Sequence, residues 1–149
     1  MPISHILAEG IGPFKKVHLD LRGPDGHPSL GPHILAGVNG SGKSTILKAI
    51  AWCLAGPQEE FADTNPRVLL IFEAGTRRYA VARTNARAGD QQGGLWSWAN
   101  ETMAGAGLNP TDFPLRKEAD RKFNVASYSS ARFEMLKDYR LKPVDSYSD

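Results

Sequence analysis

Hydrophobic and polar residues alternate along the start of the chain in a way that predicts two short strands. The first covers residues 3–10 and the second covers residues 14–23. Glycine and proline at residues 10–13 supply the turn between them. In the second strand, apolar and polar positions largely alternate, as is typical of a half-buried antiparallel strand: Phe14, Val17, Leu19 and Leu21 against Lys16, His18 and Asp20.

The next segment predicts a strand, a glycine-rich turn and a helix. Residues 23–32 are dense in glycine and proline and predict a loop. Residues 33–37 (HILAG) predict a short, buried, apolar strand. After the glycine-rich turn, Gly56 and Pro57 mark the end of a helix whose apolar residues recur at helical spacing: Ile46, Leu47, Ile50 and Leu54.

The second half of the chain predicts a β-hairpin followed by less regular structure. Residues 67–84 predict two strands joined at residues 74–76. We expect a flexible loop over residues 85–94 and a third strand of the same sheet over 95–100, in which Trp96 and Trp98 share one face. Beyond it we expect a short polar helix over 115–123, a strand over 125–133 and a disordered tail over 142–149.

Length and composition indicate a single globular domain over residues 1–149. The hydrophobic fraction of 41% and the charged fraction of 23% are ordinary for such a domain. The net charge of +2 is too small to point to a polyanionic partner. Cys53 has no second cysteine to pair with, the N-terminus lacks signal-peptide features, and no apolar run is long enough to cross a bilayer. We therefore expect a cytoplasmic protein with no membrane partner.

One motif carries specific chemistry, because residues 37–44 (GVNGSGKS) match the pattern G-x-x-x-x-G-K-[ST] between an apolar segment and a helix. The glycines let successive N–H groups face one anion at a helix N-terminus. Lys43 would contact the β- and γ-phosphates, and the Ser44 hydroxyl would bind Mg²⁺. The motif thus predicts a site for ATP and Mg²⁺ formed by Gly37, Asn39, Gly40, Ser41, Gly42, Lys43, Ser44 and Thr45.

Three stretches resemble a known family. Residues 37–45 (GVNGSGKST) and 10–21 (GIGPFKKVHLDL) are similar to the phosphate loop and the N-terminal strand pair of ABC-type ATPases of the SMC, RecF, RecN and SbcC group, and the hairpin over 68–84 resembles their antiparallel β-lobe. The AAA-type ATPases of bacterial defence systems are similar too. The resemblance covers the first half of the chain. It implies an α/β P-loop fold with a mixed sheet, an antiparallel β-lobe and one main helix after the phosphate loop, an incomplete ABC-type head.

The groups that this family uses for hydrolysis are not found in the sequence. The family has an adjacent Asp–Glu pair after an apolar strand and a serine–glycine–glycine signature from a second head. Glu73 follows five apolar residues, but it is a single carboxylate at a hairpin end, and a structural role is the better interpretation. Residues 127–133 (SYSSARF) lack the signature glycines. The catalytic residues are therefore left unassigned.

The remaining candidates are two lysines, the histidines with Cys53, and a set of basic residues. Lys15 and Lys16 either approach the nucleotide or, as we favour, form a solvated strand edge. The histidines and Cys53 do not cluster at metal-ligand spacing, and we predict no metal site made by protein ligands alone. A set of basic residues forms either a DNA-binding surface or, as we favour, a mixed surface face: Arg77, Arg78, Arg83, Arg87, Arg116, Lys117, Arg121 and Lys122.

Two functions remain. The first is the ATP-binding N-terminal lobe of an ABC/SMC-like ATPase in DNA repair or phage defence, which needs a C-terminal lobe or a second head as its partner for hydrolysis. The alternative is a non-catalytic nucleotide-binding module that regulates another chain. ATP turnover by the isolated chain distinguishes them.

Overall fold

The computed structural model describes residues 2–29, 31, 33–38, 40–55, 65–84 and 92–116. The two N-terminal strands, the helix after the glycine-rich turn and the hairpin are confirmed. In chain order the elements are β1 (Ile3–Ile11), β2 (Phe14–Asp20), α1 (Lys43–Ala55), β3 (Arg67–Ala74), β4 (Arg77–Thr84), α2 (Gln92–Gly105), a 3-10 helix (Pro110–Asp112) and β5 (Leu115–Arg116).

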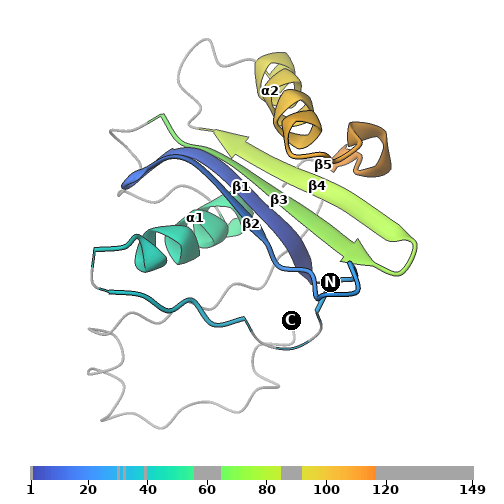
Figure 1. The fold of residues 1–149 in the computed structure, drawn as a ribbon. Coiled ribbons are helices and arrows are strands. Elements are labelled where there is room, and N and C mark those ends of the chain that lie inside the picture. Colours follow the sequence, from blue (N-terminus) through green and yellow to red (C-terminus); the bar gives the residue numbers. More distant parts are fainter. Residues whose placement is uncertain are drawn as a thin grey trace, which may run out of the picture.

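The strands form one five-stranded sheet with the order β2-β1-β3-β4-β5 (Figure 1). β1 is antiparallel to both β2 and β3, and β3 and β4 form the antiparallel hairpin. β5 pairs in parallel with β4, which makes the sheet mixed. The predicted fold class, an α/β fold with a mixed sheet and an antiparallel lobe, is confirmed.

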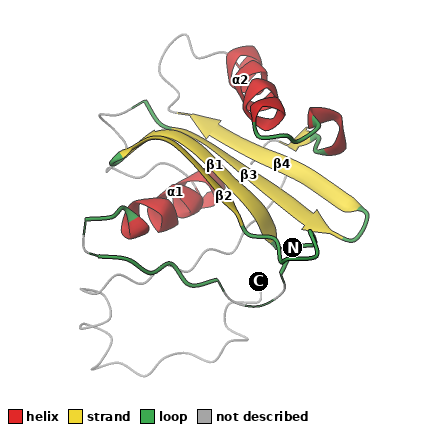
Figure 2. Cartoon of the chain, in the orientation of Figure 1, coloured by secondary structure: helices red, strands yellow, loops and turns green. Residues whose placement is uncertain are grey.

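The two helices cover opposite faces of this sheet (Figures 1 and 2). Val68 and Leu70 of β3 pack with α1, whereas Leu69 and Ile71 of the same strand pack with α2. A strand covered on both faces needs apolar residues at every position, which explains the continuous run in residues 68–72. On the α1 side, Trp52 is 1% exposed and the Cys53 thiol is fully buried, as predicted for a core residue.

The segment expected to be a third hairpin strand, residues 95–100, is instead part of the helix α2. The expected loop over 85–94 also ends earlier, because residues 92–94 already belong to α2. The side chains that contact the sheet face recur at intervals of three and four, which is the period of a helix: Leu95, Trp98, Ala99, Met103 and Ala106. Trp98 is buried, whereas Trp96 is 37% exposed, so the two rings do not share one face.

Residues 33–37 were expected to form a buried strand, and this expectation is wrong. They form no helix or strand, and the side chain of Ile34 is 86% exposed. Apolar sequence alone does not make a strand, because its N–H and C=O groups must also pair with a neighbouring strand. In the described part of the chain, the inner strands of the sheet already pair on both sides. Leu35 alone of these residues packs partly against the α1 cluster.

Several predictions lie outside the described residues: the helix end at 56–57, most of the loop over 85–94, the strand over 125–133 and the tail over 142–149. The predicted helix over 115–123 lies mostly outside them, and its first two residues form β5. Among the residues that are described, no helix combines the length and the apolar character needed to span a bilayer.

Candidate functional site

The glycine-rich turn leads directly into the N-terminus of α1. The first described helical hydrogen bond runs from Ile46 N–H to the Gly42 carbonyl oxygen at 3.1 Å. The preceding N–H groups therefore lack partners within the helix and carry the positive end of its dipole. The turn itself is closed by Ser41 N–H, which donates to the Val38 carbonyl oxygen at 3.2 Å. This arrangement favours the binding of an anion at the start of α1.

Two of the motif glycines are required by the backbone conformation. Gly40 has a φ of +83° and Gly42 a φ of +93°. These values lie in the region that residues with a side chain rarely adopt, so the turn cannot form with most other residues at the same positions. The motif pattern and the observed conformation thus agree at these two residues.

The ammonium group of Lys43 lies over the turn. It donates hydrogen bonds to the carbonyl oxygens of Gly37 and of Val38, the latter at 2.8 Å, and lies 3.5 Å from the Ser41 hydroxyl oxygen. These contacts hold the charge beside the helix N-terminus. The first turn of α1 contains no acidic residue that would neutralise it. The lysine and the helix dipole therefore attract negative charge to the same point.

The remaining motif residues differ in their surroundings. Ser44 is exposed in the first turn of α1, so its hydroxyl is accessible to a cation held by phosphates. Thr45 is partly buried, and its side chain lies against Gly12, where an added Cβ would come within 2.7 Å of Thr45 Cγ2. Asn39 lies outside the described residues. The role of each residue toward ATP stays a prediction.

The turn between β1 and β2 contacts the phosphate loop, and the motif did not predict this. A Cβ added to Gly42 would lie 2.4 Å from Phe14 Cε2 and 3.1 Å from Pro13 Cγ. These residues are nearly thirty positions apart in the sequence, so no local pattern links them. The only indication in the sequence was that residues 10–21 and 37–45 resemble the same family of ATPases.

Glu73 lies at the opposite end of the sheet from the phosphate loop. The strand register pairs Arg67 with Glu9, near the turn that contacts the loop, and pairs Phe72 with Ile3 at the far end of β1. Glu73 is six positions along β3 from Arg67, or roughly 20 Å at 3.3 Å per residue. Glu73 instead lies 3.7 Å from the Arg78 guanidinium. It cannot contact phosphates held at the loop, and the structural interpretation is favoured.

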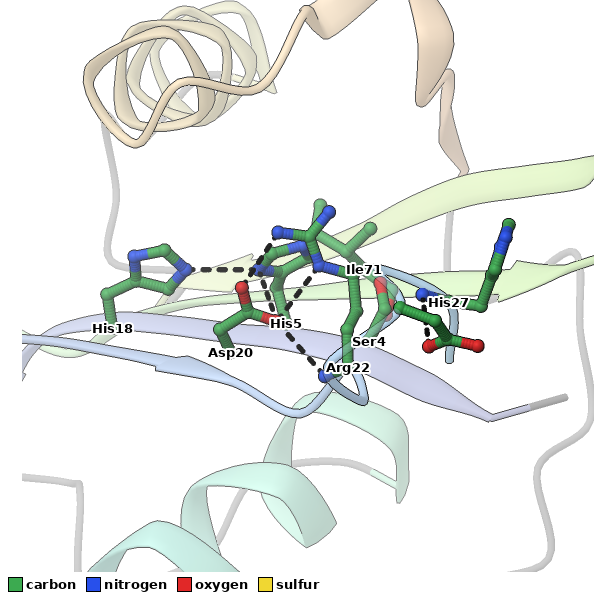
Figure 3. Close-up of polar contacts among 8 residues, drawn as sticks. Ser4, His5, His18, Asp20, Arg22, His27 and Ile71 are labelled. Atoms are coloured by element: carbon green, nitrogen blue, oxygen red, sulfur yellow. Dashed lines mark hydrogen bonds and ion pairs between the residues drawn. The ribbon is translucent and has the colours of Figure 1, made fainter. Parts of the chain in front are cut away.

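A polar cluster also lies at this far end, on the face opposite α1 (Figure 3). His5 Nδ1 is 3.0 Å from His18 Nε2, a hydrogen bond in which one ring donates to the other. Asp20 accepts two hydrogen bonds from the Arg22 guanidinium, at 3.0 and 2.8 Å. The Arg22 side chain holds the pKa of the Asp20 carboxyl well below its usual range. Burial lowers the pKa of His5 more than the nearby Asp20 raises it.

The lowered pKa of His5 predicts that acid destabilises the fold. Below the ordinary histidine pKa of about 6.5, the unfolded chain binds a proton that folded His5 does not, so the free energy of unfolding falls as pH drops. The slope from one such group is at most about 1.4 kcal/mol per pH unit. Urea unfolding at pH 7.5 and 5.5 measures it. We expect His5→Gln to lose less stability on acidification than the wild type.

The matched control for this prediction is His27→Gln, which changes an exposed histidine in the loop after β2. This variant should show the same pH dependence as the wild type. Equal pH dependence in the wild type and His5→Gln would contradict the prediction.

The described arginines do not form one basic surface. Arg67, Arg83 and Arg116 lie over aromatic rings, at 6.0 Å from Trp98, 5.7 Å from Trp52 and 5.3 Å from Tyr79. Arg77 and Arg78 are at the hairpin turn, at the other end of β4 from Arg83. The remaining basic residues of the predicted set lie outside the described residues: Arg87, Lys117, Arg121 and Lys122.

The lysines of β2 lie on an edge strand of the sheet. Lys16 is exposed and lies 3.7 Å from the Glu9 carboxylate. This arrangement favours the solvated-edge interpretation for Lys16. Lys15 is exposed beside the turn that contacts the loop, so both interpretations of it stay open. Within the described ranges, no group of three or more His, Cys, Asp or Glu side chains is placed to hold a metal ion.

The glycine turn, the lysine above it and the helix that starts beneath it define a P-loop nucleotide-binding domain. The chain belongs to the AAA domain family, whose model matches residues 5–132. This is a family of P-loop ATPases, and membership implies nucleotide binding. No curated protein and no solved structure gives a significant match to the chain.

Proposed function

We propose that this chain binds ATP and Mg²⁺ at residues 37–45. It does so as the N-terminal lobe of an ABC/SMC-like ATPase in DNA maintenance or phage defence, and hydrolysis requires a second lobe. The observation that carries the nucleotide site is the Lys43 ammonium, held by two loop carbonyls at the N-terminus of α1. The resemblance of residues 10–21 and 37–45 to the SMC and RecF group supports a role in DNA maintenance or phage defence.

The residues at the loop fit the phosphates of a nucleoside triphosphate. The carbonyls of Gly37 and Val38 orient the Lys43 ammonium, which carries three donors and can pair with an anion as well. N–H groups at the start of α1 supply neutral donors to the same anion. The Ser44 hydroxyl, exposed beside them, is the Mg²⁺ ligand that we propose from this chain, and the metal would neutralise the phosphate charge.

Hydrolysis also needs a carboxylate close to the γ-phosphate, and the described residues do not place one there. Glu9 is on β1 near the end that contacts the loop. It faces a cavity of about 370 Å³ beside α2, on the sheet face away from α1, and it pairs with Lys16. Glu73 is at the far end of the sheet. We therefore propose that another lobe supplies this group.

An apolar surface around α1 supports such a partner. Ile34 is 86% exposed, Val38 78% and Leu47 57%. Beside them lies a groove of about 390 Å³ lined by Ile3, Ile6, Leu21, Leu35, Leu47 and Ile50. Exposed apolar residues next to an apolar groove favour a protein contact surface here. The occupant that we propose is the C-terminal ATPase lobe, with a strand paired along residues 33–38.

The Mg²⁺ ligand can be tested with Ser44→Ala. Because this substitution removes one oxygen ligand and no phosphate donor, we expect the gain in ATP affinity on adding Mg²⁺ to shrink, while metal-free binding is kept. Calorimetry with ATP, with and without Mg²⁺, measures both. Ser97→Ala, on the exposed side of α2, is the control. A Mg²⁺ response like that of the wild type would show that other groups hold the cation.

The non-catalytic alternative predicts the same ATP binding but no turnover with any ATPase lobe. The observation that favours it is that Glu9 faces away from α1 and Glu73 lies at the far end of the sheet. Phosphate release in the presence of the partner lobe separates the two functions.

A further inference from the structure

The ring of Phe14 lies directly against the backbone of the phosphate loop. A Cβ built on Gly42 would be 2.4 Å from Phe14 Cε2 and 2.5 Å from Phe14 Cζ, distances that real atoms do not adopt. The ring therefore occupies the space next to the Gly42 Cα, at the residue that joins the turn to α1.

A second contact of the same turn lies just beyond the lysine and serine of the motif. An added Cβ on Gly12 would be 2.7 Å from Thr45 Cγ2 and 2.8 Å from Thr45 Oγ1. The β1–β2 turn thus contacts the residue before Lys43 and the residue after Ser44. The two residues with the predicted phosphate and Mg²⁺ roles are held between these contacts.

Phe14 is also anchored to the core of the fold. Its partner across the strand pair is Ile11, and both pack in the cluster that contains α1. Leu7 faces α2, and side chains alternate between the two faces of a strand. Regular alternation would therefore place Ile11, and Phe14 opposite it, on the α2 face as well. Gly10, next to Ile11, has a φ of +66°, and both Ile11 and Phe14 lie in the α1 cluster instead. Phe14 therefore connects the sheet to the loop.

We propose that Phe14 is a positioning residue for the phosphate loop. Its ring packs against the Gly42 backbone and so keeps the N–H groups and the Lys43 ammonium arranged for an anion before any nucleotide binds. Glycine is the residue with the most conformational freedom, so an unsupported Gly42 would leave this arrangement readily. A site ordered in advance loses less entropy on binding. The link to ATP rests on the proposed function, but the ordering of the loop does not.

The test compares Phe14→Ala with Val17→Ala. Val17 is a partly buried residue of the same strand and packs against the same cluster, so it controls for loss of core packing. Phe14→Leu keeps an apolar side chain in contact with the loop. Urea unfolding of all variants shows whether the fold and its stability are retained.

The first measurement is amide hydrogen exchange without nucleotide. The N–H groups of Ser41 and Ile46 are hydrogen-bonded within the loop and at the start of α1, so their exchange reports loop opening. We expect exchange about tenfold faster in Phe14→Ala, little change in Val17→Ala, and partial recovery in Phe14→Leu. The second measurement is MgATP affinity, which we expect to fall about tenfold in Phe14→Ala alone.

Exchange at Ser41 and Ile46 that is unchanged in Phe14→Ala, or equally fast in Val17→Ala, would overturn the positioning role. If the wild type binds no ATP, the proposed function fails, and the exchange data still decide the role of Phe14. If exchange rises in Phe14→Ala while ATP affinity stays that of the wild type, the loop is ordered by Phe14 but binding does not depend on that order, and the proposal is wrong in its functional part.

Discussion

Replacing Lys43 by alanine is expected to weaken MgATP binding by roughly tenfold to a hundredfold while the fold is retained. A charge-assisted hydrogen bond contributes about 1.5–3 kcal/mol, which corresponds to that range in affinity. The ammonium of Lys43 is held by the carbonyls of Gly37 and Val38, so its loss removes a charge that is already in place. Calorimetry with MgATP, after urea unfolding has shown a stable fold, measures the effect.

Two further variants make this result specific. Lys43→Arg keeps the charge, but a planar guanidinium cannot take the same position over two carbonyls, so we expect it to bind MgATP poorly as well. Arg77→Ala removes one positive charge from an exposed residue at the hairpin, at the far end of the sheet. It should bind as the wild type does. If Lys43→Ala binds MgATP with unchanged affinity, residues 37–45 are not the nucleotide site.

The elements that could be predicted from the sequence are those with strong local signals. The pattern at residues 37–44 combines glycines that need positive φ with a helix that starts at Lys43, and both features are seen. The hairpin at 67–84 has a turn at Gly75 between two apolar runs. In each case neighbouring residues contain the information, because the conformation depends on contacts close in the chain.

The helix α2 was missed because a short window gave the wrong period. Trp96 and Trp98 are two residues apart, which matches the alternation of a strand. The helical period appears only when Leu95, Trp98, Ala99 and Met103 are considered together. Nonlocal partners caused the other errors. Residues 33–37 have the composition of a strand but pair with no strand among the described residues, and the contact of Phe14 with Gly42 crosses nearly thirty positions of sequence.

One of these errors, the strand expected at residues 33–37, bears on function. Ile34, which the sequence assigned to a buried strand, is exposed, and so are Val38 in the phosphate loop and Leu47 on α1. A segment whose composition predicts burial, but which is largely exposed at an apolar groove, fits the contact surface that we propose for a second lobe. This favours a function in which nucleotide binding by the chain and catalysis by a partner are separate.

The chain by itself is therefore expected to bind ATP and to hydrolyse it very slowly. Ground-state binding depends on the loop and on Lys43, which are in place, whereas rate depends on groups that act more strongly in the transition state. Of the described carboxylates near β1 and β3, Glu9 faces away from α1 and Glu73 lies at the opposite end of the sheet. Steady-state phosphate release by the purified chain measures the rate, with Lys43→Ala as the control for contaminating ATPases.

If the proposed second lobe exists, adding it as a separate chain or in one longer polypeptide is expected to raise phosphate release by at least about a hundredfold, the order of effect of a positioned general base. The stimulation should disappear in Lys43→Ala, because the partner cannot act on a nucleotide that is not bound. It should also weaken in Ile34→Asp, which places a charge on the exposed apolar surface and leaves the loop residues unchanged. Rapid, Lys43-dependent turnover by the chain alone would contradict the two-lobe proposal and would mean that the catalytic carboxylate belongs to this chain.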